Sequence, residues 1–208
     1  VDQCNSIGKD LQCTDVMEEW GGDEKSKYMY TRSSNKKVNW VCKKDSHHRW
    51  ESTISHRTGK NPKGCPICAN QKICPIDQCN SIGKDPQCTD VMKEWGGDEK
   101  SKYMYTRSSG KKVKWICGRD MHHKWESAIY SRTGKNPTGC PICANKFICP
   151  IDQCNSIGKD PQYVELMKEW DGDEKSKYMY TPSSNKKVQW VCKKDSHHRW
   201  ESTIKNRT

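Results

Sequence analysis

Cysteine and histidine side chains recur in this sequence at a spacing that suits a single metal ion. The pattern Cys-x5-His-x16-Cys-x2-Cys occurs twice, 75 residues apart. Two thiolates separated by two residues can reach one ion from the same turn, and a third thiolate with an imidazole completes a tetrahedral shell for Zn2+. The predicted ligands are Cys42, His48, Cys65 and Cys68 in the first copy and Cys117, His123, Cys140 and Cys143 in the second. We therefore expect one zinc ion per complete copy.

Disulfide bonds are the alternative explanation for the 14 cysteines of this chain. A disulfide framework does not explain why His stands at the same offset from Cys in every copy, with a Cys-x2-Cys pair at a fixed distance in the two complete copies. Metal ligation explains both regularities. Thiolate ligands also favour a reducing environment, so we expect an intracellular location or the inside of a virion.

A β-hairpin must position the first two ligands of each site. Residues 112–117 alternate in polarity, with Val113 and Trp115 on one face, and residues 123–129 alternate again. The residues between them favour a turn. We expect this turn to be a zinc knuckle, because it places Cys117 and His123 at the same end of the hairpin.

Helices are predicted on both sides of the hairpin. Asp85 and Pro86 suit the start of a helix, and the apolar spacing extends the pattern to Trp95. Residues 98–102 are polar and predict a loop. Residues 140–143 predict the start of a short helix that carries the second pair of ligands. The order knuckle, hairpin and ligand-bearing helix is that of a treble clef.

Internal repetition sets the domain organisation. The sequence DQCNSIGKD begins at Asp2 and recurs at Asp77 and Asp152, a period of 75 residues. We expect three domains: residues 1-75, residues 76-150, and residues 151-208, the last ending before its Cys-x2-Cys pair. Cys192 and His198 are then half of a metal site. We interpret the chain as a segment of a longer array, with a degenerate terminal repeat as the alternative.

The composition favours small domains with little apolar core. Only 32% of the residues are hydrophobic and there is a single Phe, whereas there are 9 Trp. Metal ions and a few buried indoles are expected to take the place of a large core. The predicted fold class is therefore a series of small α+β zinc-stabilised domains. No apolar run is long enough for a membrane span, and we expect no membrane partner.

Several short motifs occur in order through the second copy. They include KEW at residues 93–95, WIC at 115–117, HKW at 123–125, SRT at 131–133 and GCPIC at 139–143. With these motifs the whole chain resembles the zinc-ribbon or treble-clef zinc finger domain family. That family is often tandem and is common in large DNA viruses, with members in bacteria, plants and algae. The resemblance implies zinc binding, and nucleic-acid binding is the usual conjecture for the family.

The resemblance also bears on which histidine is the ligand. The His of the family lies two residues before Trp, which corresponds to His48, His123 and His198 in this sequence. The preceding residues, His47, His122 and His197, stand where the family usually has Gly. The neighbouring imidazole is therefore an alternative ligand.

Seven cysteines lie outside the predicted zinc pattern: Cys4, Cys13, Cys74, Cys79, Cys88, Cys149 and Cys154. Cys74 and Cys79 form a Cys-x4-Cys pair that recurs as Cys149 and Cys154. A second metal site would need two more ligands. On ligand count we favour buried thiols or a disulfide over a second zinc ion.

Positive charge is concentrated in the metal-binding half of a repeat. The chain carries a net charge of +11, and residues 107–151 contain nine Lys or Arg against two acidic residues. A solvated basic face is the plain interpretation, and a phosphate-binding face is the functional one. The predicted phosphate-contacting residues are Lys36, Lys37, Arg57, Lys111, Lys112, Lys114, Lys124 and Arg132.

The function predicted from the sequence is non-enzymatic. A zinc ion with four protein ligands has no open position for water or substrate, so no small-molecule substrate is expected. The leading hypothesis is a tandem zinc-binding module that binds nucleic acid with low sequence selectivity. The alternative is a structural protein whose repeats contact protein subunits, for example in a viral particle. The tryptophans are expected to form the core of each repeat rather than stacking platforms for bases.

Overall fold

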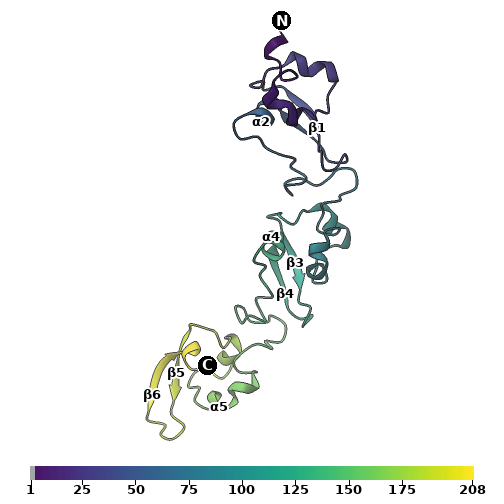
Figure 1. The fold of residues 1–208 in the computed structure, drawn as a ribbon. Helices are drawn as coiled ribbons and strands as arrows, with labels where there is room; N and C mark the ends of the chain where they lie inside the picture. Colours follow the sequence, from purple (N-terminus) through teal and green to yellow (C-terminus); the bar gives the residue numbers. More distant parts are fainter. Residues whose placement is uncertain (1–2) are drawn as a thin grey trace. The chain divides into compact units, whose positions relative to one another are not determined.

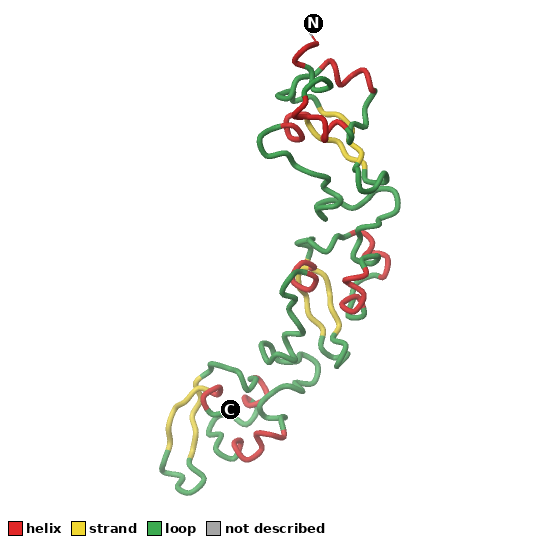
Figure 2. Tube along the Cα trace, in the orientation of Figure 1, coloured by secondary structure: helices red, strands yellow, loops and turns green. Residues whose placement is uncertain are grey.

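The computed structural model describes residues 3–208, and the same order of elements appears three times along the chain (Figures 1 and 2). The first repeat contains η1 (Gln3–Asn5), η2 (Leu11–Cys13), α1 (Thr14–Met17), η3 (Glu24–Met29), β1 (Lys37–Val41), β2 (Arg49–Thr53) and α2 (Ile54–Thr58), where η marks a 3-10 helix. Each repeat thus combines short helices with one antiparallel hairpin.

The second and third repeats follow the same plan. The second contains η4 (Pro86–Cys88), α3 (Thr89–Met92), η5 (Glu99–Met104), β3 (Lys112–Ile116), β4 (Lys124–Ala128) and α4 (Ile129–Thr133). The third contains η6 (Pro161–Tyr163), α5 (Val164–Met167), η7 (Ser176–Met179), β5 (Lys187–Val191), β6 (Arg199–Thr203) and η8 (Ile204–Asn206). This agrees with the predicted class of small α+β domains.

The chain divides into two compact units. One comprises residues 1–92 and 98–111, and the other comprises residues 93–97 and 112–208. The division falls within the second repeat, and the repeat boundaries at residues 75 and 150 stay a prediction. In the described part of the chain, no helix is both long and apolar enough to cross a membrane.

Tryptophans set the register of each hairpin and fill its inner face. Trp40 lies opposite Trp50, and Trp115 lies opposite Trp125. Trp40 and Trp115 are fully buried. In the first repeat, Trp20 forms an isolated bridge with Trp40, and the two rings meet edge to face with centroids 5.4 Å apart. This confirms the prediction that the indoles are the core.

Gly21 allows the chain to approach the hairpin at this point. Its backbone N–H donates to the carbonyl of Asn39 at 2.9 Å. A Cβ at this position would lie 3.0 Å from the carbonyl oxygen of Asn39 and 3.0 Å from a methyl group of Val41. A side chain here needs a small shift of the strand, and the third repeat accommodates one, since Asp171 makes the matching bond to the carbonyl of Gln189 at 3.1 Å.

Two predictions about the helices need correction, and one helix was not predicted. The helix that begins at Pro86 ends at Met92 rather than reaching Trp95, and residues 99–104 form η5 rather than a loop. The side chain of Asp98 accepts hydrogen bonds from the backbone of Lys100 and Ser101, which starts η5. A further helix, α4, follows the hairpin directly.

The expected helix at residues 140–143 is a single turn. The backbone N–H of Ala144 donates to the carbonyl of Cys140 at 3.1 Å, which is one helical hydrogen bond. Asn145 then adopts a positive φ of 53°, and this left-handed conformation ends the turn. The two cysteines are therefore presented by a turn rather than by a helix.

Candidate metal centres

The turn of each hairpin has the knuckle geometry predicted from the sequence. In the first repeat the backbone N–H of Cys42 donates to the carbonyl of His48 at 3.0 Å. The N–H of His48 in turn donates to the carbonyl of Asp45 at 3.0 Å, and a side-chain oxygen of Asp45 accepts from the N–H of His47 at 2.8 Å. These bonds hold Cys42 and His48 at the same end of the hairpin.

The second pair of cysteines is held by the loop that follows. Ile67 lies between Cys65 and Cys68 and is buried in the core of the first repeat, which anchors the turn. The amide group of Asn80 donates to the carbonyls of Ile67 and Lys72, at 3.0 and 2.8 Å. Asn155 makes the matching bonds in the next repeat. Apart from its recurrence at the same position, no pattern in the sequence indicates this role of Asn80.

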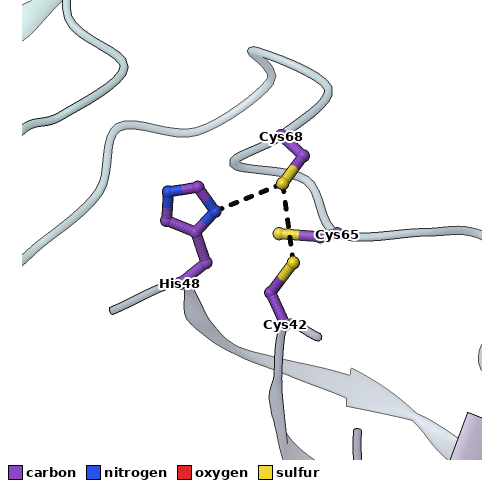
Figure 3. A group of neighbouring side chains, drawn as sticks. All are labelled: Cys42, His48, Cys65 and Cys68. Atoms are coloured by element: carbon purple, nitrogen blue, oxygen red, sulfur yellow. Dashed lines mark hydrogen bonds between the residues drawn. The ribbon is translucent and has the colours of Figure 1, made fainter. Parts of the chain in front are cut away.

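All four predicted ligands converge in both complete repeats. Figure 3 shows the group of the first repeat. In each group the ligand atoms lie within 4.8 Å of one another. In the first repeat, Nδ1 of His48 is 3.2 Å from Sγ of Cys68, which is 3.5 Å from Sγ of Cys42. In the second repeat the matching distances are 3.2 and 3.6 Å. Three thiols and one imidazole form a donor set that fits zinc.

The structure also separates the two neighbouring histidines. His48 and His123 are buried within the clusters. His47 and His122 are exposed, and their imidazoles face the carboxylates of Asp77 and Asp152 at 3.6 and 3.4 Å. The histidine two residues before Trp is therefore the one that joins the cysteines.

The third repeat shows the hairpin without the second pair of cysteines. Cys192 and His198 keep the knuckle, since the N–H of Cys192 donates to the carbonyl of His198 at 2.9 Å. The His198 side chain is 71% exposed, whereas that of His48 is 9% exposed. In the first repeat, the imidazole of His48 is thus buried where Cys65 and Cys68 lie beside it. That Cys192 and His198 are half of a metal site stays a prediction.

The thiols of one cluster have different proton affinities. Burial, together with the neighbouring thiols of Cys42 and Cys65, raises the pKa of Cys68 to about 12. Burial acts in the same direction on Cys42, but hydrogen bonds from the backbone of Lys44 and Asp45 bring the pKa of this thiol below its ordinary value. A cation bound among these sulfurs would have to displace the protons, because the thiolate is the ligand form.

Metal uptake by each centre is expected to release about three protons to the solvent, because three thiols bind the ion as thiolates. Since the raised pKa of Cys68 keeps its thiol protonated at neutral pH, affinity should increase as the pH rises and fall as the pH falls. Calorimetric titration with zinc in buffers of different ionisation enthalpy measures the released protons. An enthalpy that does not depend on the buffer would contradict thiolate ligation.

The predicted phosphate-contacting residues fall into two groups. Six lysines are exposed: Lys36, Lys37, Lys111, Lys112, Lys114 and Lys124. Arg57 and Arg132 are buried, with exposed fractions of 5% and 8%. Each guanidinium stacks on two indoles and pairs with a carboxylate, that of Glu19 or Glu94. These two arginines are core residues and are not available to a phosphate.

Comparison with protein families gives one match that recurs along the chain. A family model described as a probable treble clef zinc finger domain matches residues 16–71, 91–146 and 166–208. Each matched segment contains one hairpin with its knuckle, and the first two also contain the Cys-x2-Cys turn. A search of curated proteins gives no match.

Proposed function

Because this chain belongs to the family of probable treble clef zinc finger domains, we propose that it is a non-enzymatic, tandem zinc-binding protein that binds nucleic acid through phosphate contacts. Each complete repeat would hold one Zn2+ through three thiolates and one imidazole. Such a shell leaves no open position for a substrate. The role of the metal is then to hold the hairpin and the loop together, as in other small zinc domains.

The exposed lysines of the second hairpin are the observation that carries the nucleic-acid proposal. Lys112 and Lys114 alternate with the inward residues Val113 and Trp115, so both ammonium groups point away from the core. Lys114 and Lys124 line one surface pocket together with Trp125 and one carboxylate, that of Glu126. A cationic groove beside an aromatic ring suits a phosphate backbone whose bases can stack. Contacts of this kind carry little sequence information.

Acidic residues reduce the positive charge of this surface. Glu126 lies opposite Lys114 in the strand register, and in the first repeat Lys37 is 4.0 Å from the carboxylate of Glu51. These pairs are exposed, so each contributes little energy and can open when a phosphate approaches. The net charge of +11 still favours association with a polyanion.

Replacing both Lys112 and Lys114 with Ala is expected to weaken binding to all sequences alike. Each lost phosphate contact should reduce the slope of log affinity against log salt by about one unit. The measurement is a salt titration of binding to short duplexes and single strands, with the zinc-loaded protein. A matched control is the Lys25→Ala, Lys100→Ala variant, which removes the same charge from the exposed, acidic halves of two repeats. Equal effects of the two variants would contradict a specific phosphate-binding face.

A structural role is the second candidate, and exposed methionines favour it. Met29, Met104 and Met179 occupy equivalent positions and are 74%, 67% and 66% exposed. A repeated exposed methionine suits an adaptable protein contact. If the protein shows no binding to nucleic acid at low salt, protein subunits of an assembly become the preferred partners.

A further inference from the structure

The imidazole of His48 has a second group of sulfurs on its other side. While Nδ1 faces Cys68, Nε2 lies 3.0 Å from Sγ of Cys79. Cys74 completes this group, and the ligand atoms of His48, Cys74 and Cys79 lie within 4.8 Å of one another. Both nitrogens of one ring therefore face cysteine sulfur at comparably short distances.

The same arrangement recurs in the second repeat. Nε2 of His123 lies 3.0 Å from Sγ of Cys154. Cys149 completes this group, and the three ligand atoms again lie within 4.8 Å of one another. Cys74 and Cys149 are fully buried. The knuckle sequences differ, since Gly118, Arg119 and Met121 replace Lys43, Lys44 and Ser46. The two repeats therefore have the same group of ligand atoms although the sequences of their neighbouring turns differ.

A carboxylate stands next to each group. Oδ2 of Asp45 is 3.4 Å from Nε2 of His48, and Oδ2 of Asp120 is 3.4 Å from Nε2 of His123. Asp120 is also 4.0 Å from Sγ of Cys154. The same aspartates fix the knuckle through their other oxygen and their carbonyl. Two thiols, one ring nitrogen and one carboxylate are the number and kind of ligands that zinc takes.

We propose that each of these groups binds a second zinc ion, held by Cys74, Cys79 and Nε2 of His48, with Asp45, whose Oδ2 is 3.4 Å from the same nitrogen, as the fourth ligand. The matching ligands in the next repeat are Cys149, Cys154, His123 and Asp120. The histidine then bridges two ions as an imidazolate. When the second ion binds, both thiols and the ring N–H lose their protons to solvent, and nothing is oxidised or reduced. The chain binds four zinc ions rather than two.

This proposal replaces the interpretation of Cys74 and Cys79 as buried thiols or a disulfide. A disulfide between Cys74 and Cys79 would use both sulfurs and would not need the imidazole nitrogen beside them. A hydrogen bond from Nε2–H to Asp45 is the other alternative, because ligating histidines commonly donate their second N–H to a carboxylate. The hydrogen bond accounts for the carboxylate, whereas a second ion also accounts for the two sulfurs that lie near the same nitrogen.

The number of zinc ions per chain tests the proposal. The protein, saturated with zinc and passed through a desalting column under reducing conditions, is expected to contain four ions by elemental analysis. The Cys79→Ser, Cys154→Ser variant should contain two, because the first centres keep all their ligands. The control variant is Cys13→Ser, Cys88→Ser, which removes two buried thiols outside both groups and should retain four ions. Two ions in the unmodified protein, or four in the Cys79→Ser, Cys154→Ser variant, would overturn the proposal.

A measurement on the unmodified protein tests the proposal even if the variants fail to fold. Alkylation followed by mass spectrometry should show Cys74, Cys79, Cys149 and Cys154 protected in the zinc-saturated protein and reactive after chelation. Alkylation of Cys79 as fast as that of the exposed Cys4 would contradict the second site. Cobalt substitution gives a second readout, since two Co2+ ions bridged by one imidazolate couple magnetically. Uncoupled cobalt at full loading would rule out the bridge.

Discussion

Replacing Cys140 with Ser is expected to unfold the metal-binding half of the second repeat and leave that of the first folded. Zinc binding contributes on the order of 10 kcal/mol or more to small zinc domains, and one missing thiolate removes a large part of it. Little apolar core remains to compensate, because the buried cluster around Cys140 consists of Cys117, Cys140, Ile142 and Cys149. Chelation of all the zinc should unfold both repeats.

Heteronuclear NMR of the zinc-loaded variant separates the two repeats, because each hairpin contributes its own indole N–H signals. Those of Trp115 and Trp125 should lose their dispersion, while those of Trp40 and Trp50 should not change. The control is Cys88→Ala, which removes a buried thiol that belongs to no ligand group among the described residues. Retained structure at Trp115 in the Cys140→Ser variant would show that the metal does not hold this repeat.

The residue pattern predicted which four side chains gather in the Cys42, His48, Cys65 and Cys68 group because their spacing is local. Cys42 and His48 flank one turn, and Cys65 and Cys68 lie in another, so two short segments define the site. The hairpin was predictable for the same reason, since strand alternation is visible within five residues. The short helices were less predictable, because a cap such as Asp98 decides where they begin.

The surroundings of the ligands could not be predicted, because they depend on contacts between distant residues. Cys79 lies 31 residues after His48 in the sequence. The number of cysteines in the linker does not indicate that the second ring nitrogen of His48 lies beside one of them. The charge of Arg132 predicts an exposed, phosphate-contacting side chain, and this prediction is wrong. Its partner Glu94 lies 38 residues away, and no local pattern connects the two.

Replacing Arg132 with Ala is expected to destabilise the zinc-loaded protein by about 3–5 kcal/mol, the usual effect of breaking a buried ion pair. The guanidinium lies 5.2 Å from the ring centroid of Trp115 and 5.3 Å from that of Trp125, and it donates to Glu94 and to the carbonyl of Thr138. Without it, Glu94 keeps its charge among partly buried groups. Arg132→Lys should recover only part of the loss, because an ammonium cannot stack and donate in the same plane.

Urea denaturation followed by tryptophan fluorescence measures this loss, and two comparisons identify its source. Arg132→Leu combined with Glu94→Leu should be more stable than Arg132→Ala alone, since it leaves no unpaired charge behind. Arg57→Ala should behave like Arg132→Ala, because Arg57 stacks on Trp40 and Trp50 and pairs with Glu19 in the same way. If Arg132→Ala instead kept full stability and only flattened the salt dependence of nucleic-acid binding, the arginine would be a phosphate contact and the buried pair would not form in solution.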